Sequence, residues 1–144
     1  MINSESKTSD RMAFLLNPDK NESPVPDMIK SLKQLERSGA DTIFITCNTA
    51  YAFIDYLLKA KSKNTTIINM IEESSNSLKK YDHKKILLLA SDGTLKTGIY
   101  NKYLGNDILQ PKLGSNEQKI VMDIMYGKYE IKAGYRATSS CTNN

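Results

Sequence analysis

Residues 42–50 read TIFITCNTA, and this stretch decides the fold class of the 144-residue chain. An apolar run ends at Cys47, and the polar Asn48 and Thr49 come before residues with helical spacing. A strand that leads directly into a helix is typical of open α/β sheets, whose ligands bind beyond the carboxyl ends of the strands. The start of a helix favours bound anions and the thiolate form of a cysteine. Cys47 is therefore a candidate thiolate beside a binding place for an acid, and the alternative is that it is a small buried hydrophobe.

Predicted strands and helices alternate along the rest of the chain. A first helix starts near Pro24 and is closed by Gly39, and the last, over 116–126, has an apolar stripe of Ile120, Val121, Ile124 and Met125. The remaining strands are expected at 41–46, 65–70, 85–90 and 107–109, and the remaining helices at 49–60, 71–81 and 95–104. The strand at 85–90 is almost continuously apolar, as in a parallel sheet that is covered on both faces. We therefore predict an α/β fold with three layers, in which helices cover a parallel sheet.

Composition narrows the classes of function. The chain is 40% hydrophobic and 25% charged, which is typical of a globular protein, and its net charge is +4. No basic run is interleaved with aromatic residues, so we expect no nucleic-acid binding, whereas the positive excess suits a small anionic substrate. Two distant cysteines and the lack of a signal peptide or spanning segment favour a cytoplasmic location with no membrane partner. Two cysteines and one histidine at no ligand spacing predict no metal site.

Four ordered sequence blocks carry a resemblance to a known family. They are CNTA at 47–50, ASDGTLKTGIY at 90–100, DR at 10–11 followed by AFLL at 13–16, and YG at 126–127 followed by IKAG at 131–134. The chain resembles the aspartate/glutamate racemase superfamily, and the last two blocks resemble its aspartate racemase branch. Order and spacing agree over roughly residues 3–134. The resemblance implies two similar lobes, with a partial first lobe at 1–82 and the start of an incomplete second lobe at 83–134. Residues 135–144 have no periodicity, so we expect them to form an unstructured tail.

The resemblance also implies a reaction and a set of site residues. In this family, racemisation needs neither pyridoxal phosphate nor a metal, and two thiols act on opposite faces of the substrate's α-carbon. Cys47 would be one of these bases, and a small acidic amino acid, aspartate or glutamate, would be the substrate. The implied binding residues are Asn48 and Thr49 for the α-groups, Thr94 for the α-carboxylate, and Arg11 and Lys132 for the side-chain carboxylate. The resemblance allows a homodimer.

The chain also departs from the family pattern. Members usually begin with a Gly-rich strand and turn, which this sequence lacks, and they often have His where Tyr51 stands. Their second cysteine lies in a Gly-Cys-Thr-Glu block. Here six residues separate Gly134 from Cys141, whereas a helix plus a strand needs about 17.

These departures lead us to expect a chain truncated at both ends and inactive as a racemase. The alternatives are another enzyme of the superfamily (hydantoin racemase, maleate isomerase or malonate decarboxylase) and a non-catalytic truncated product.

Overall fold

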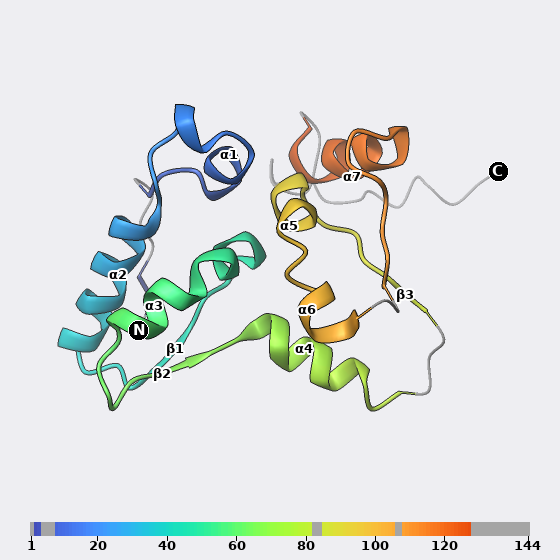
Figure 1. Cartoon of the computed structure of the whole chain (residues 1–144). Coiled ribbons are helices and arrows are strands. Elements are labelled where there is room, and N and C mark those ends of the chain that lie inside the picture. Colours follow the sequence, from blue (N-terminus) through green and yellow to red (C-terminus); the bar gives the residue numbers. More distant parts are fainter. Residues whose placement is uncertain (1, 4–7, 82–84, 106–107, 128–144) are drawn as a thin grey trace, which may run out of the picture.

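Helices and short parallel strands alternate in a computed structural model that describes residues 2–3, 8–81, 85–105 and 108–127. The first half of the chain contains α1 (Arg11–Leu16), η1 (Pro18–Lys20), α2 (Val25–Arg37), β1 (Thr42–Phe44), η2 (Asn48–Phe53), α3 (Ile54–Ala60) and β2 (Thr66–Ile68). The second half contains α4 (Met70–Leu78), β3 (Ile86–Leu87), α5 (Asp92–Thr97), α6 (Asn101–Leu104), β4 (Ile108–Leu109) and α7 (Asn116–Tyr126). In Figure 1 the two halves lie side by side, with α1 facing α5 across their junction. The predicted limits of the second lobe and of the tail, at 82–83 and at 135–144, lie outside the described residues.

The strands confirm the parallel α/β class and divide it into two sheets. β1 pairs in parallel with β2, Ile43 opposite Ile67, and β3 pairs in parallel with β4. All four strands are two or three residues long, so three of them are much shorter than predicted. Burial alternates along β1, where Ile43 is buried, but Leu87 of β3 is 63% exposed. The apolar run at 85–90 is therefore not covered on both faces by the described residues.

Helix α2 ends where its sequence predicted. Gly39 has a φ of +89°, in the left-handed region that glycine enters without a steric penalty. Its N–H donates to Glu36 O, and the N–H of Ala40 donates to Leu35 O, both at 3.0 Å. These two bonds form a Schellman motif, which satisfies carbonyls at the end of the helix.

Four helices differ from their predictions, and the one expected at 71–81 runs from Met70 to Leu78. The residues at 49–60 begin as a 3-10 helix and become α-helical only at Ile54, and those at 95–104 start earlier, at Asp92, and break at Gly98 with a φ of +59°. Helix α7 has the predicted bounds, but Ile120 and Ile124 of its apolar stripe are exposed.

Helix α1 was not predicted. The carboxylate of Asp10 caps it by accepting from the N–H groups of Met12 and Ala13, at 2.8 and 3.1 Å.

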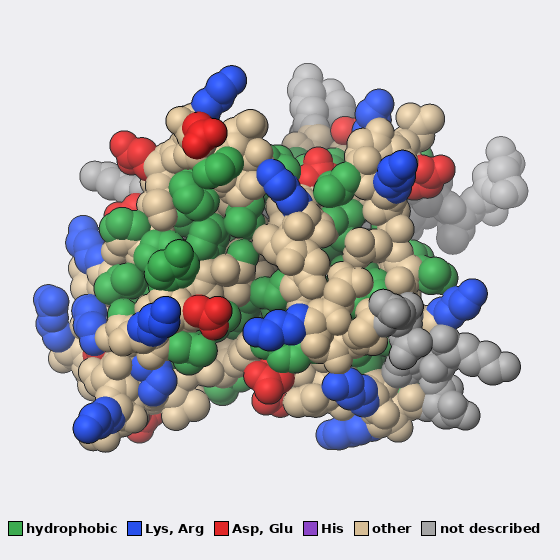
Figure 2. Space-filling model, in the orientation of Figure 1, with side chains coloured by type: hydrophobic (Ala, Val, Ile, Leu, Met, Phe, Trp, Pro, Cys, Tyr) green, Lys and Arg blue, Asp and Glu red, His purple; other side chains and the backbone are tan. Residues whose placement is uncertain are grey.

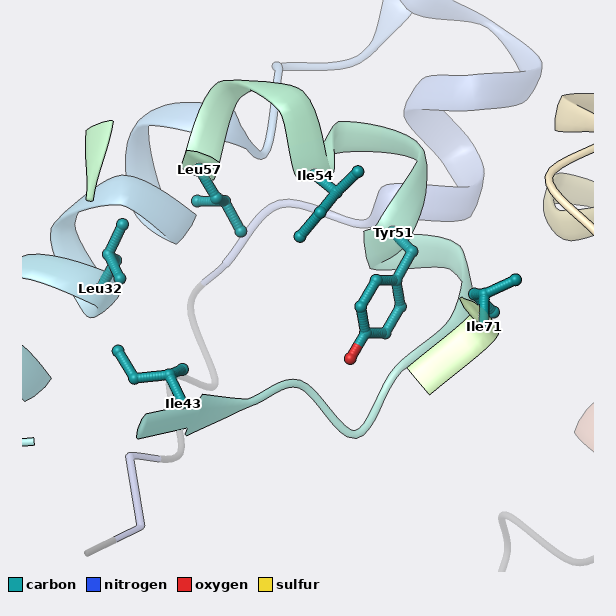
Figure 3. Packing of buried hydrophobic residues seen from close by; sticks show 6 residues of the cluster. All are labelled: Leu32, Ile43, Tyr51, Ile54, Leu57 and Ile71. Carbon is teal, nitrogen blue, oxygen red and sulfur yellow. The ribbon is translucent and has the colours of Figure 1, made fainter. Parts of the chain in front are cut away.

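The main core lies where α2, α3 and β1 meet. Figure 3 shows Leu32, Ile43, Ile54 and Leu57 pointing toward one another, with the Tyr51 hydroxyl turned toward the chain that leaves β1. That hydroxyl lies 3.1 Å from Ile45 O and 3.0 Å from Ile68 O. Because these carbonyls follow β1 and end β2, Tyr51 holds the carboxyl ends of the two strands together.

Glu36 holds the end of α2 against the loop before β2. Its carboxylate accepts from Lys33 Nζ, from the N–H and hydroxyl of Ser62, and from the hydroxyl of Thr65, at 2.6–2.9 Å. The hydrogen bond from Lys33, followed by that from the Ser62 N–H, lowers the pKa of Glu36 from 4.5 to about 2. The ionised form of this side chain is therefore the one that the fold favours.

On the face seen in Figure 2, hydrophobic side chains gather on the left, over the first half of the chain, and Lys and Arg lie mainly around them. Among the helices of the described ranges, none has the length and apolar character needed to cross a membrane.

Candidate active site

Three buried hydroxyls join the two halves of the chain. Thr49 follows β1, whereas Ser91 and Thr94 follow β3. The Oγ1 atom of Thr49 lies 3.2 Å from that of Thr94 and 3.4 Å from Ser91 Oγ, and Ser91 Oγ lies 3.2 Å from Thr94 Oγ1. Each hydroxyl can donate one hydrogen bond and accept others, so the three can satisfy one another in this hydroxyl ring, and a hydroxyl that rotates away from the ring can donate to a ligand. It brings together the carboxyl ends of strands from both sheets.

A cavity of about 410 Å³ opens beside the hydroxyl ring. Its wall includes Cys47 and Asn48 after β1, Arg11 on α1, and Tyr126 on α7. The remaining lining residues are Thr8, Asp10, Met12, Thr46, Thr49, Leu89, Ala90, Ser91, Thr94 and Met125. The cavity thus combines one thiol, one cation and several hydroxyl groups, which can receive a small polar anion, and its one carboxylate, Asp10, accepts from the N–H groups at the start of α1.

Cys47 occupies the junction from which its role was inferred. It is half-buried, has an extended backbone, and precedes the first residue of η2. Next to it, Asn48 Oδ1 is buried and has no hydrogen-bond partner among the described residues. A buried carbonyl oxygen without a donor is costly, and a ligand N–H at this position would satisfy it.

Arg11 reaches the cavity because α1 packs closely on α5. A Cβ atom at Gly93 would lie 3.2 Å from Met12 Cγ and 3.3 Å from both Met12 Cα and Thr49 Cγ2, so a side chain at this position would crowd the approach of α1 to α5. Lys96 Nζ also donates to Leu16 O at 3.1 Å. The Arg11 guanidinium makes no hydrogen bond or ion pair with the part of the chain that the structure describes, so it is available to a carboxylate.

A smaller cavity of about 240 Å³ shares Arg11, Cys47, Thr8 and Thr46 with the first. It extends between α2 and β1 and has a mainly apolar lining that includes Leu32, Leu35 and Ile43. The thiol and the guanidinium therefore stand between a polar space and an apolar one.

The structure brings five of the six predicted site residues to one cavity: Arg11, Cys47, Asn48, Thr49 and Thr94. Lys132, like Cys141, lies outside the described residues, and its role stays a prediction. The roles of the other five stay predictions as well, because a shared cavity fixes their position and not their chemistry. Within the described ranges, no three or more His, Cys, Asp or Glu side chains gather as metal ligands do.

The sequence reasoning did not single out Ser91 and the residues that α7 contributes to the cavity. Ser91 was noted only as part of the sequence block at 90–100, although that block already contained its hydroxyl three positions before Thr94. Met125 was placed on an apolar stripe, and Tyr126 was noted only as part of a sequence block. Their presence at the cavity depends on how α7 docks, which no local pattern specifies.

A protein-family model and a solved structure each match most of this chain. The family model for Asp/Glu/hydantoin racemases matches residues 9–128. The solved structure of Picrophilus torridus aspartate racemase matches with a TM-score of 0.68 and 26% identity, over 85% of this chain and 56% of that one.

Two curated relatives match shorter regions. The broad specificity amino-acid racemase RacX of Bacillus subtilis (strain 168) is 30% identical over 79 residues, 54% of this chain and 33% of its own length. The glutamate racemase of Aquifex pyrophilus is 37% identical over 71 residues, 49% of this chain and 28% of its own length. The chain thus spans about a third or less of these two relatives and little more than half of the Picrophilus enzyme. Because the family model covers 9–128, including both strand-to-helix junctions that form the cavity, the chain belongs to the Asp/Glu/hydantoin racemase family.

Proposed function

We propose that this chain acts on the α-carbon of a small acidic amino acid, aspartate or glutamate, with Cys47 as the base on one face and without pyridoxal phosphate or a metal. The observation that carries the proposal is the convergence of Cys47, Arg11 and the hydroxyl ring on one cavity. Membership of the racemase family supports the reaction class. The named relatives, an aspartate racemase and a glutamate racemase, support an acidic substrate.

The proposed chemistry begins with the Cys47 thiolate, which removes the α-proton and leaves a carbanion conjugated with the α-carboxylate. Charge that develops on this carboxylate needs donors fixed in advance, and the hydroxyls of Thr49 and Thr94 are candidates. Asn48 Oδ1 would accept from the α-ammonium group, which would satisfy a buried oxygen that otherwise has no partner among the described residues.

The side-chain carboxylate is assigned to Arg11, whose planar guanidinium can hold it in a bidentate pair. Lys132 is proposed as a second cation for the same group, on the basis of its sequence block alone. A homodimer, which the family resemblance allows, is compatible with this scheme.

Racemisation also needs an acid on the opposite face of the carbanion. Cys47 is the single cysteine of the described residues, and Cys141 has too little chain before it for the helix and strand that carry the second thiol in the family. Loss of one positioned acid or base costs about 10²- to 10⁴-fold in rate. We therefore propose that the 144-residue chain exchanges the α-proton of one enantiomer and racemises poorly.

The test is solvent deuterium uptake at the α-carbon of D- and L-aspartate and of D- and L-glutamate, followed by proton NMR. We expect uptake into one enantiomer, lost in Cys47→Ala and kept in Cys141→Ala. Chelators should leave the uptake unchanged, and the purified protein should show no absorbance from pyridoxal phosphate. Absence of exchange into all four amino acids by a folded protein would refute the function. Efficient racemisation abolished by Cys141→Ala would instead identify Cys141 as the second base.

A further inference from the structure

The side chain of Gln118 on α7 is almost fully buried and reaches across to the turn that carries Ser91. Only 1% of the residue is exposed. Its Nε2 atom donates to Ala90 O at 3.0 Å and to Asp92 Oδ1 at 2.8 Å. These two acceptors are on the neighbours of Ser91, one on each side of it in the sequence. Gln118 therefore holds the backbone carbonyl before Ser91 and the carboxylate side chain after it, on either side of one member of the hydroxyl ring.

The orientation of this amide follows from its partners. A flipped amide would bring Oε1 against two oxygen acceptors, which have no hydrogen to donate to it, so Nε2 must face the turn. The cost of this arrangement is that Oε1 is buried without a partner among the described residues. An apolar side chain of the same length would avoid that cost, so the amide is best explained by its two donated bonds.

The capping pattern of α7 supports the same conclusion. Ser115 caps the helix by accepting from the N–H of Gln118 at 3.3 Å, which is half of a capping box. In a complete capping box the glutamine side chain would return to the N–H of Ser115. Here both hydrogens of that amide go to the β3–α5 turn instead. The side chain thus serves a long-range contact rather than its own helix.

Other α7 residues on the same face contact the β3–α5 turn or line the cavity. Met122 Sδ accepts from the N–H of Asp92 at 3.4 Å, and Met125 and Tyr126 form part of the cavity wall. Positions 118, 122, 125 and 126 follow the i, i+4, i+7, i+8 spacing of one helix face. The face that carries Gln118 therefore meets both the cavity and the residues on either side of Ser91.

We propose that Gln118 is a positioning residue, which holds Ser91 so that its hydroxyl, with those of Thr49 and Thr94, forms the subsite for the substrate's α-carboxylate. This inference rests on the proposed function for the identity of the ligand. It assigns a role to two residues, Ser91 and Gln118, that the proposed chemistry does not use. Without the amide, the turn is free to shift and Ser91 Oγ leaves hydrogen-bonding distance of its two partners.

The experiment compares binding of D- and L-aspartate to four folded proteins by NMR titration: wild type, Gln118→Met, Ser91→Ala and the double variant. Methionine keeps the length and helix preference of glutamine while removing both donors. Loss of one hydrogen bond to a charged carboxylate lowers affinity by about 10-fold, so we expect that loss in each single variant. Because Gln118 acts through Ser91, the double variant should also lose about 10-fold rather than about 100-fold.

Ser115→Ala is the matched control for stability. It removes the cap of α7, which costs the protein stability, but it keeps both side-chain bonds of Gln118. We expect its affinity for aspartate to stay within about 2-fold of wild type. If Gln118→Met proves unfolded, Asp92→Asn takes its place, because it weakens one of the two contacts without changing volume, and about a 3-fold loss is expected.

The outcomes separate the inference from the proposed function. Wild-type protein that binds neither enantiomer would refute the proposed function and the carboxylate subsite together. If wild type binds aspartate and Gln118→Met binds it with the same affinity, the positioning role alone is overturned. The positioning role would also be overturned if losses in the double variant multiplied, or if Ser115→Ala weakened binding as much as Gln118→Met.

Discussion

Replacing Tyr51 with Phe should destabilise the protein by removing one buried hydroxyl. The residue is 1% exposed, and its hydroxyl lies 3.1 Å from Ile45 O and 3.0 Å from Ile68 O. A hydroxyl has one hydrogen, so the two carbonyls share a single donor. Phenylalanine fills the same space, so no large cavity is created, and the loss is that of the hydrogen bond.

The size of the effect follows from burial. A hydrogen bond contributes about 1 kcal/mol net, and a buried acceptor left without its donor raises the loss toward about 2 kcal/mol. For a chain of this length, 1 kcal/mol corresponds to about 3 °C in Tm. We therefore expect Tyr51→Phe to lower Tm by about 3–6 °C.

The assay is thermal and urea unfolding of Tyr51→Phe beside Tyr56→Phe. Tyr56 belongs to the same stretch of helix but is 56% exposed, so the same change there should alter stability by less than about 0.5 kcal/mol. Equal stability of the two variants would refute the view that Tyr51 joins the ends of β1 and β2.

Three further predictions concern Glu36, the contact of α1 with α5, and the thiol. The pKa of Glu36 is lowered to about 2, so the ionised carboxylate contributes fully to folding stability above pH 4.5, and this contribution is lost as the pH falls toward 2. In urea unfolding, Glu36→Gln should therefore have a lower midpoint than wild type at pH 7. Its midpoint should also vary less than that of wild type between pH 4.5 and pH 2. Gly93→Ala gains less than about 1 kcal/mol in helix preference, because Gly93 lies in the first turn of α5, and we expect crowding against Met12 and Thr49 to cost more, about 1–3 kcal/mol. It should therefore weaken both stability and aspartate affinity, whereas Gly39→Ala, strained at φ +89° with no atom within 4 Å, should weaken stability alone. Iodoacetamide should alkylate Cys47 more slowly when aspartate is present, and alkylation of Cys141, followed in parallel by mass spectrometry, should not change.

Local sequence patterns predicted the parts of the fold that depend on neighbouring residues. The end of α2 at Gly39 was predicted because a left-handed residue and its two hydrogen bonds lie within six positions. The junction at Cys47 was predicted because an apolar run stops there. Arg11 and Thr94 were matched to the same site by sequence blocks, and the packing of α1 on α5 brings them there.

Local patterns failed where distant segments decide the outcome. Whether the four short strands form one sheet or two depends on how the two halves pack against each other. The sequence of a single strand does not specify this packing. In α7, the apolar residues Ile120 and Ile124 are exposed while the polar Gln118 is buried. Burial of this amide is compensated by hydrogen bonds to two acceptors that lie 26 and 28 residues away in the sequence. Hydrophobic periodicity identifies only apolar positions, so it does not predict a buried amide that is stabilised by hydrogen bonds to distant residues.

The candidate site lies at the junction of the two halves, away from most of the main core. Substitutions at the site and in the core should therefore affect different properties of the protein, ligand affinity and folding stability. The hydroxyl ring takes Thr49 from one half and Ser91 and Thr94 from the other, and Gly93 sets how closely α1 approaches. The main core, by contrast, consists mostly of residues of the first half around Leu32, together with Ile71 of α4. A small shift at the junction moves donors by tenths of an ångström relative to a bound carboxylate while most apolar burial is retained. Changes at the junction should therefore affect ligand affinity more than stability, and changes in the core of the first half should do the reverse.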